Sequence, residues 1–278
     1  MQLRTRTLNL SRPRVMGVIN CTPDSFSDGG RYLDVDAAVA HAERMLAEGA
    51  DIIDVGGESS RPGATPVPEA EECRRVVPVV RTLVERHGCV VSVDTMKPAV
   101  MRAACAAGAE LINDISALRG AGAIRIAAAT GAGVCLMHMQ GEPGTMQRAP
   151  HYDGVVREVT AFLATRIAAC RAAGIPSTRL CVDPGFGFGK RIEHNLALLA
   201  RLDSLQALGV PLLVGMSRKS MLGDLTGRAV SDRLAGGLAA VTIAVLRGAQ
   251  IVRTHDVAAT VDAVKVAWAV KGATEQMG

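Results

Sequence analysis

Polar residues with ligand-binding side chains stand at the ends of eight short apolar runs in this chain. They are Asn20, Asp54 with Glu58, Asp94, Asn113, His138, Asp183, Ser217 to Lys219, and Arg253 with His255. Carboxylates and amides such as Asp94, Asn113 and Asp183 suit the paired N–H donors of a guanine-like heterocycle. Cationic donors suit an oxyanion or a diphosphate, and the chain offers Arg61, Arg218, Lys219, Arg253 and His255. The combination predicts a ligand with a flat polar ring at one end and phosphate at the other.

Purely structural roles compete with this interpretation at several positions. An Asp at the end of a strand often caps the following helix, and for Asp54 we favour that structural role. His138 in "CLMHMQ" fits a satisfied core histidine, and Met137 beside it fits core packing. Asp94 and Asp183 each precede a turn that they could cap. A purely capping role for both carboxylates is the weaker explanation, because they are expected to lie opposite Lys219 and Arg253.

The segment "DPGFGFGKR" is not a phosphate-binding loop, although its glycines suggest one. Its glycine spacing is short by a residue, and no Ser or Thr follows Lys190. We interpret it as a turn that lines the pocket with Phe188 and leaves Lys190 in solvent. The HExxH, GxSxG and paired-cysteine nucleophile motifs are absent from the sequence. A Schiff base on Lys219, as in an aldolase-like barrel, stays open, but its Arg and Ser neighbours suit anion binding at least as well.

A repeated unit must position these residues: an Ala-rich amphipathic stretch, a glycine, a short β-branched run and a polar residue. The glycines of the seven units are Gly49, Gly88, Gly108, Gly131, Gly174, Gly209 and Gly248. Such a glycine suits the left-handed residue that ends a helix, and continuously apolar runs suit parallel strands buried on both faces. With an opening strand at Val15 to Ile19, the chain has eight strands separated by helices. This alternation favours a (β/α)8 TIM barrel, with its active site at the carboxyl ends of the strands, over a doubly wound open sheet.

Local signals add detail to this plan. Pro98 stands where a helix tolerates a first-turn proline, and Ser231 could cap the helix that carries Leu234 and Leu238. The residues before Arg14 predict a short N-terminal hairpin that plugs the bottom of the barrel. Because no linker interrupts the chain, we expect a single domain over residues 1–278, with its core at about 14–271.

Composition narrows the class of protein. Of the 278 residues, 49% are hydrophobic and 21% charged, which is typical of a soluble globular protein. A net charge of +4 is too small to imply nucleic-acid or membrane binding. The longest apolar run, Leu234 to Leu246, is too short for a membrane span and predicts a helix buried on most sides, with a subunit interface as one way to bury it. Seven scattered cysteines and an N-terminus without a secretory signal predict a cytoplasmic protein with free thiols.

Taken together, the motifs resemble the dihydropteroate synthase family of folate biosynthesis. The matching segments are "VMGVINCTPDSFSDGG", "DIIDVGGESSRPGA", "VSVDT", "LIND", "LMHMQG", "VDPGFGFGK", "GMSRKS" and "RTHDV". The resemblance implies a (β/α)8 barrel that condenses 6-hydroxymethyl-7,8-dihydropterin diphosphate with 4-aminobenzoate, giving 7,8-dihydropteroate and diphosphate. It also implies Mg²⁺ as cofactor, sulfonamides as inhibitors and a homodimer, with neither nucleic acid nor membrane as partner.

The resemblance assigns roles position by position. It places the pterin pocket at Asp94, Asn113, Asp183 and Lys219, with walls at Met137, Phe188 and Gly215. It places diphosphate binding at Arg253 and His255, and the magnesium beside Asn20. It places the aminobenzoate side at Phe26 and Ser220, and a second mobile loop at Ser60, Arg61 and Pro62. The residues expected to carry the chemistry are Asp94, Lys219, Arg253 and His255.

In this family, the segments after Asn20 and Glu58 are mobile and close over the diphosphate. Diphosphate departure leaves a cationic dihydropterin methylene, which the amine of aminobenzoate attacks. Magnesium, Arg253 and His255 would stabilise the leaving group, Asp94 would oppose the cation, and closed loops would exclude water. Two other functions stay open. A pterin-binding methyltransfer domain would not need the diphosphate site, and a non-catalytic paralogue would keep the fold for binding alone.

Overall fold

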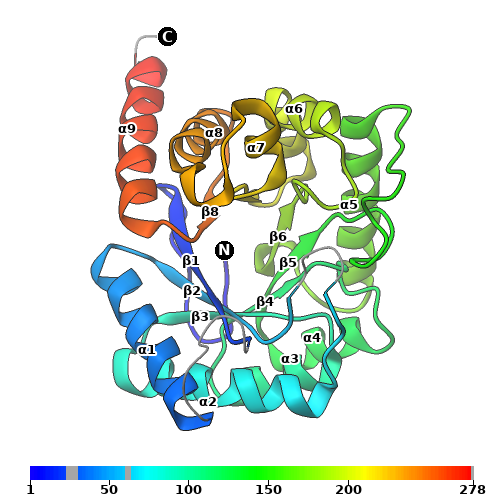
Figure 1. Cartoon of the computed structure of the whole chain (residues 1–278). Coiled ribbons are helices and arrows are strands. Elements are labelled where there is room, and N and C mark those ends of the chain that lie inside the picture. Colours follow the sequence, from blue (N-terminus) through cyan, green and yellow to red (C-terminus); the bar gives the residue numbers. More distant parts are fainter. Residues whose placement is uncertain (23–30, 60–63, 277–278) are drawn as a thin grey trace.

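The computed structural model describes residues 1–22, 31–59 and 64–276. Within these ranges the strands are β1 (Arg14–Asn20), β2 (Ile52–Gly56), β3 (Val90–Asp94), β4 (Leu111–Asp114), β5 (Gly133–Met137), β6 (Leu180–Asp183), β7 (Leu213–Gly215) and β8 (Ile251–Thr254). They form one parallel sheet in the order β6-β5-β4-β3-β2-β1-β8-β7. A parallel bridge between Val182 and Leu212 joins the two end strands. The sheet therefore closes into the predicted (β/α)8 TIM barrel and not into a doubly wound open sheet (Figure 1).

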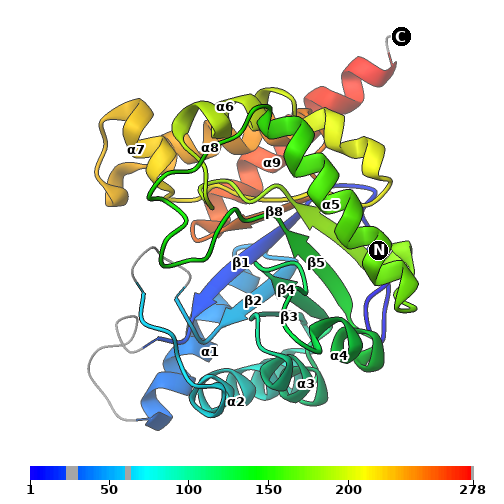
Figure 2. The same cartoon turned by 90° about the vertical axis from the view of Figure 1, so that its right-hand side faces the viewer.

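Helices follow the strands and surround the barrel (Figures 1 and 2). They are α1 (Arg31–Ala47), α2 (Glu69–His87), α3 (Pro98–Ala106), α4 (Ala123–Thr130), α5 (Val155–Ala172), α6 (Ile192–Ala200), α7 (Ser220–Thr226), α8 (Leu234–Leu246) and α9 (Val257–Gln276). Three short 3-10 helices complete the described ranges: η2 (Ser177–Arg179), η3 (Leu202–Leu208) and η4 (Val230–Asp232). The main hydrophobic core fills the layer between the outer face of the barrel and this ring of helices.

The predicted helix-ending glycines all adopt the left-handed conformation. Their φ angles are positive at every one of the seven positions, from 57° at Gly88 to 113° at Gly108. Gly88 shows the expected geometry, since it ends α2 and its N–H donates to the carbonyl oxygen of Val84 (3.0 Å). A positive φ costs little for glycine and much for any other residue, which explains why glycine stands at these positions. The repeat boundaries predicted from the sequence are therefore confirmed.

One predicted helix start is right and one is wrong. Pro98 begins α3, as expected. Ser231 does not cap the following helix: it lies in η4, and α8 begins at Leu234 after Arg233, with no side-chain hydrogen bond at the cap. The intervening 3-10 turn moves the hydroxyl too far along the chain to reach the first free N–H groups of α8.

The predicted N-terminal hairpin is confirmed. Gln2 and Thr7 form an antiparallel bridge, and the N–H of Leu3 donates to the carbonyl oxygen of Arg6 (2.8 Å). Leu3 and Leu8 are buried in a cluster with side chains from the barrel interior, namely Met16, Ile52, Leu111, Cys135, Cys181, Leu213 and Ile251. The hairpin therefore closes the amino end of the barrel and leaves only the carboxyl end open to ligands.

None of the helices in the described ranges is long and apolar enough to cross a membrane. The apolar run at Leu234 to Leu246 forms α8, which packs along α9 on the outside of the barrel. All seven cysteines are free thiols.

Candidate active site

The carboxyl ends of neighbouring strands lie level, so their polar residues meet at one mouth of the barrel. Gly56 of β2 pairs in register with Asp94 of β3, and Asp94 pairs with Asn113 of β4. On the other side, Met137 of β5 pairs with Asp183 of β6, and Gly215 of β7 with Arg253 of β8. The residues expected to hold the pterin therefore come from successive strands of the barrel.

Arg253 connects two carboxylates across this mouth. Its Nε donates to Oδ2 of Asp54 (2.7 Å), and an Nη donates to Oδ2 of Asp94 (2.7 Å). Nδ2 of Asn113 donates to the same Asp54 oxygen (3.1 Å). Asp54 is fully buried and holds these two groups, so the capping role favoured for it from the sequence is wrong.

Burial and neighbouring charges shift the pKa values of the groups in this cluster. Burial raises the pKa of Asp94 to about 7, although Arg253 opposes the rise and Asp54 adds to it. Burial lowers the pKa of Arg253, but Asp54 and Asp94 outweigh burial and keep it above its ordinary value. Arg253 therefore stays charged, while Asp94 is the group of the pair that changes its protonation near neutral pH.

Asp183 and Lys219 form the opposite wall of the mouth. Oδ1 of Asp183 accepts the N–H of Gly185 (2.7 Å), which leaves its other oxygen available. Nζ of Lys219 donates to the carbonyl oxygen of Phe186 and lies 4.6 Å from the ring centroid of Phe188. Burial lowers the pKa of Lys219 to about 8, against the opposing effect of Asp183. Burial also raises the pKa of Asp183, with Lys219 opposing.

Apolar side chains form a wall between these polar groups. Met137 is buried in a small cluster that also contains Ile115, Met139 and Met146, and Phe188 packs against it. Gly215 lies beside Arg253, and a Cβ at this position would come 3.6 Å from the Cβ of Arg253. This is an ordinary van der Waals separation, so the first carbon of a side chain would fit at position 215.

The remaining predicted residues lie around the rim. His255 follows β8, and its Nδ1 lies 3.1 Å from Oγ of Ser217. Asn20 ends β1 and is partly exposed, and Ser220 begins α7 and is exposed. Arg218 does not join the mouth cluster but makes an ion pair with Asp256. The other predicted positions lie outside the described residues: Phe26, Ser60, Arg61 and Pro62.

Glu58 is held by a network that the sequence did not reveal. Nζ of Lys97 binds the carboxylates of Glu58 and of the buried Glu72, and Glu58 also accepts the N–H of Val67 (2.7 Å). A small cavity of about 20 Å³ lies between Lys97 and Asp94, which is enough for one water molecule. The signal in the sequence was Lys97, which follows shortly after the strand-end Asp94. Its partners Glu58 and Glu72 are 39 and 25 residues away, so the sequence did not connect them.

Lys190 corrects a second prediction. It is not solvated but 3% exposed, and its Nζ contacts Nδ1 of His138 (2.9 Å). His138 is buried, as expected of a satisfied core histidine. Lys190 is buried by tertiary contacts, because the carboxyl end of β5 and the loop after β6 enclose it from both sides.

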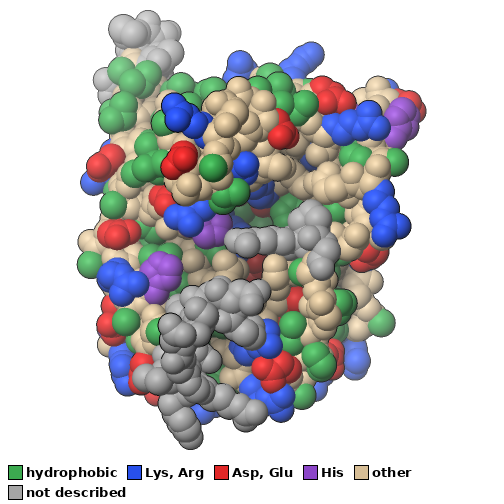
Figure 3. All heavy atoms as spheres, viewed as in Figure 1, with side chains coloured by type: hydrophobic (Ala, Val, Ile, Leu, Met, Phe, Trp, Pro, Cys, Tyr) green, Lys and Arg blue, Asp and Glu red, His purple; other side chains and the backbone are tan. Residues whose placement is uncertain are grey.

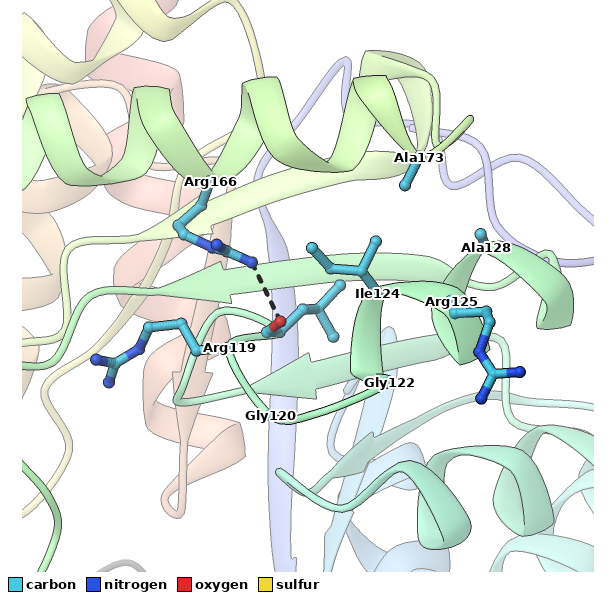
Figure 4. Close-up of a pocket in the computed structure, with 9 residues that line it drawn as sticks. Arg119, Gly120, Gly122, Ile124, Arg125, Ala128, Arg166 and Ala173 are labelled. Carbon is cyan, nitrogen blue, oxygen red and sulfur yellow. Dashed lines mark hydrogen bonds between the residues drawn. The ribbon is translucent and has the colours of Figure 1, made fainter.

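A larger hollow lies elsewhere on the molecule. It is a cavity of about 590 Å³. Figure 4 shows its lining residues, which come from the loop before α4, from α4 itself and from α5. Arg166 points to its floor and donates to the carbonyl oxygen of Leu118 (3.1 Å), while Arg119 and Arg125 point in different directions. This cavity shares no lining residue with the polar mouth, so its arginines do not supply the predicted anion site.

Comparison with known proteins agrees with this geometry. Residues 16–255 match the model of the family described as pterin binding enzyme. Dihydropteroate synthase from Escherichia coli (strain K12) is 53% identical over 269 residues, which cover 97% of this chain and 95% of that protein. Among solved structures, the Yersinia pestis dihydropteroate synthase in a sulfonamide drug complex has a TM-score of 0.93 and 51% identity, covering 98% of this chain and 99% of that one.

A further solved structure carries the expected product. It is the dihydropteroate synthase from Xanthomonas albilineans in complex with 7,8-dihydropteroate, with a TM-score of 0.88 and 53% identity. The match covers 96% of this chain and 97% of that one. With a family match over most of its length and relatives this similar from end to end, the chain belongs to the pterin-binding enzyme family, among the dihydropteroate synthases.

Proposed function

We propose that this protein condenses 6-hydroxymethyl-7,8-dihydropterin diphosphate with 4-aminobenzoate to give 7,8-dihydropteroate and diphosphate. It is a transferase of the dihydropteroate synthase type. The observation that carries the proposal is the pairing, at one barrel mouth, of the Asp54–Arg253–Asp94 network with the Asp183–Lys219 wall. Such a site offers acceptors for a donor-rich heterocycle and cations for an anionic leaving group.

The pterin would lie between the two walls. Asp183 has a carboxylate oxygen beyond its turn bond, and it can accept the N–H donors of the aminopyrimidinone edge. Asn113 supplies an amide, and Lys219 supplies a donor for the ring carbonyl. Met137 and Phe188 offer flat apolar surface to the ring faces. Removing one partner of such a buried charged contact costs about 2–5 kcal/mol.

The reaction exchanges one bond for another at the pterin methylene. The C–O bond to diphosphate breaks with its electron pair on oxygen, and the neutral amine of 4-aminobenzoate forms the C–N bond and then releases a proton. We expect Arg253 and His255 to lie beside the leaving group, where the charge of Arg253 and a hydrogen bond from His255 would stabilise the departing oxygen. Asp94, when ionised, stabilises positive charge on the dihydropterin. Ser60, Arg61, Pro62 and Phe26 belong to the segments that we propose close over the substrates.

Magnesium is the cofactor that we propose, with Asn20 as its protein ligand. No group of three or more His, Cys, Asp or Glu side chains suited to a metal occurs among the residues that the structure describes. Proteins often hold Mg²⁺ with one or two oxygen ligands while substrate phosphates and water supply the rest. The amide oxygen of Asn20, at the rim of the barrel, is a ligand of that type. When bound, the ion would neutralise diphosphate charge.

Two rival chemistries fit the site less well. A Schiff base on Lys219 requires a free amine at the reacting carbon, yet Nζ is turned to the carbonyl oxygen of Phe186 and the ring of Phe188. A methyltransfer domain or a non-catalytic binding protein would need the pterin wall but not the set of Arg253, His255 and Asn20. Both are distinguished from the synthase by product formation.

We further propose a homodimer in the cytoplasm. Large apolar side chains are exposed on α8 and α9, including Ile243 and Leu246 one turn apart, and Val266 and Val270 one turn apart. The face in Figure 3 has hydrophobic side chains over α9. Free thiols suit a reducing compartment. We also treat residues 1–278 as one domain.

The test is product formation by the full chain. We would incubate it with dihydropterin diphosphate and MgCl₂, with and without 4-aminobenzoate, and measure dihydropteroate and released diphosphate. We expect both products together, and a strong loss in the Asn20→Ala and Asp94→Ala variants. Tight pterin binding without dihydropteroate, even in excess magnesium, would reject the synthase in favour of a methyltransfer or non-catalytic barrel.

A further inference from the structure

The loop between β6 and α6, residues 184–191, is fixed along its length by side chains from other parts of the barrel mouth. This loop follows Asp183 and carries Phe188, the two residues expected to meet the edge and the face of the pterin. The side chains that bind its backbone N–H and carbonyl groups are those of Asp183, Lys219, Asn195, Gln147 and Tyr152. The loop is therefore a rigid part of the site.

Lys190 occupies the centre of this arrangement. Its Nζ lies 2.9 Å from Nδ1 of His138, 2.9 Å from the carbonyl oxygen of Gly185 and 3.0 Å from the carbonyl oxygen of Phe188. A fourth acceptor, the carbonyl oxygen of His138, lies farther away at 3.4 Å, so the three N–H donors of an ammonium group have acceptors on both sides of the junction. Lys190 is only 3% exposed, and its loss would remove a buried donor from the carbonyl oxygens of Gly185 and Phe188, of which that of Gly185 would keep the N–H of Phe188 (3.1 Å).

His138 is suited to accept this hydrogen bond. Burial, with a further contribution from Lys190, lowers the pKa of the His138 imidazole to about 3. The ring is therefore neutral near pH 7, and Nδ1 can act as an acceptor when the proton is on Nε2. Burial also lowers the pKa of Lys190 well below its ordinary value, while Asp183 opposes the shift. The positive charge of Lys219 adds to this lowering.

The loop after β6 and the segment at the end of β5 also meet backbone to backbone. Gly185 and Gly189 have φ angles of 70° and 60°. A Cβ at Gly185 would collide with the carbonyl oxygen of His138, and one at Gly189 would collide with that of Gln140. Two side chains span this junction between the end of β5 and the loop after β6. Tyr152 does so from the rim, with its ring 6.1 Å from that of His138 and its hydroxyl donating to the carbonyl oxygen of Gly189 (2.8 Å), whereas Lys190 does so from the buried interior.

We propose that Lys190 is a positioning residue for pterin recognition, holding the loop after β6 against the end of β5 so that Asp183 and Phe188 meet the ring. It is not a catalytic residue, because its Nζ is enclosed by the protein. The inference rests on the proposed function for the identity of the ligand. It predicts that loss of Lys190 weakens pterin binding selectively, since small displacements of binding groups have large effects.

The experiment compares Lys190→Met with Arg179→Met. Arg179 is a matched control, since it also braces backbone carbonyl groups, those of Ala132 (2.9 Å) and Ala127 (3.0 Å), but outside the barrel mouth. We would measure the Kd of dihydropterin diphosphate by calorimetry and the steady-state constants. We expect Lys190→Met to raise the Kd and the KM for the pterin by roughly tenfold or more, with kcat and the KM for 4-aminobenzoate changing far less. Arg179→Met should lower the Tm but leave the pterin Kd unchanged.

A second pair of variants keeps the proposal testable if Lys190→Met does not fold. His138→Leu should weaken pterin binding in the same selective way, and the double variant should bind the pterin no worse than Lys190→Met alone. An unchanged pterin KM in Lys190→Met or His138→Leu, or an equal loss in Arg179→Met, would overturn the proposal. If the wild type binds pterin but forms no product, the proposed reaction fails, while selective weakening by Lys190→Met would still support the positioning role.

Discussion

At the scale of single residues, the site depends on buried charges that hold one another. Asp54 is fully buried and binds Arg253 and Asn113, and Arg253 in turn binds Asp94. Removing one member of a buried ion pair leaves an uncompensated charge, which is far more costly than losing a surface pair. The four residues therefore act as a unit, and substitutions within it should not be additive.

Asp54→Ala should lower the free energy of unfolding by about 3–5 kcal/mol and raise the KM for the pterin substrate. The reason is that Arg253 and Asn113 lose their common acceptor. The matched control is Asp51→Ala. Asp51 lies just before the amino end of β2, away from the mouth, and also pairs with an arginine, Arg14 (2.7 Å). Urea unfolding and steady-state kinetics would check both variants. Equal pterin KM values in Asp54→Ala and the wild type would show that Asp54 is only structural.

The pH dependence of pterin binding should report Lys219. Its pKa, lowered by burial to about 8 from 10.5, means that the folded protein loses this positive charge above pH 8. We expect the pterin Kd to rise above pH 8 in the wild type, whereas the Kd of Lys219→Met should be higher throughout and should lack this rise; any change near pH 7, where Asp94 titrates, should occur in both proteins. Calorimetric titrations between pH 7 and roughly pH 9.5 would measure this. A wild-type Kd that is flat over this range would contradict the assignment.

Lys219 should affect stability with the opposite sign. The unfolded chain keeps the Lys219 proton up to its ordinary pKa of 10.5, while the folded chain releases it near pH 8. Between these values the unfolded state binds more protons, so the free energy of unfolding contributed by Lys219 rises with pH. Binding and stability therefore respond to the same proton in opposite directions.

At the scale of elements, the two ends of the barrel have separate tasks. The carboxyl ends of the strands carry the polar mouth, whereas the N-terminal hairpin fills the amino end with Leu3 and Leu8. The backbone and hydroxyl of Thr5 bind the buried carboxylate of Glu110, which fixes the tip of the hairpin. Such a division lets stability and ligand binding be altered independently.

Leu3→Ala and Leu8→Ala should each lower the free energy of unfolding by about 2–5 kcal/mol, because each leaves a cavity in the closed end of the barrel. Neither should change kcat or the pterin KM, since the hairpin lies at the end opposite to the mouth. Leu196→Ala on α6 is the control, because that side chain is 40% exposed and should have little effect on stability. A large change in the pterin KM of Leu3→Ala would show that the two ends are coupled.

At the scale of the whole molecule, the barrel leaves apolar surface on its outside. Exposed fractions are 44% for Ile243 and 43% for Leu246 on α8, and 64% for Val266 and 53% for Val270 on α9. Because α8 and α9 pack together, these side chains belong to neighbouring elements. Exposed apolar side chains on adjoining helices are typical of a protein–protein contact.

If α8 and α9 form the proposed dimer interface, Ile243→Glu should shift the protein to a monomer, because a charge buried in an apolar interface is not compensated. Analytical ultracentrifugation at micromolar concentration would measure the state of both proteins. Arg157→Glu on α5, where the side chain is 76% exposed, is the control for an added negative charge and should remain dimeric. A wild-type protein that sediments as a monomer would rule out the dimer.

The sequence by itself determined the plan of the barrel and the types of residue at its mouth. Helix-ending glycines, short apolar runs and the polar residues after them are local signals, because a positive φ and the burial of a strand act within a few residues. Asp94, Asn113, Asp183, Lys219 and Arg253 could therefore be located from the sequence.

Which of these groups bind one another depends on the tertiary structure. Asp54 meets Arg253 across 199 residues, and Lys190 meets His138 across 52, so neither the network nor the buried lysine follows from local pattern. Burial and hydrogen bonding depend on neighbours in space, and the closing of the barrel alone brings those neighbours together.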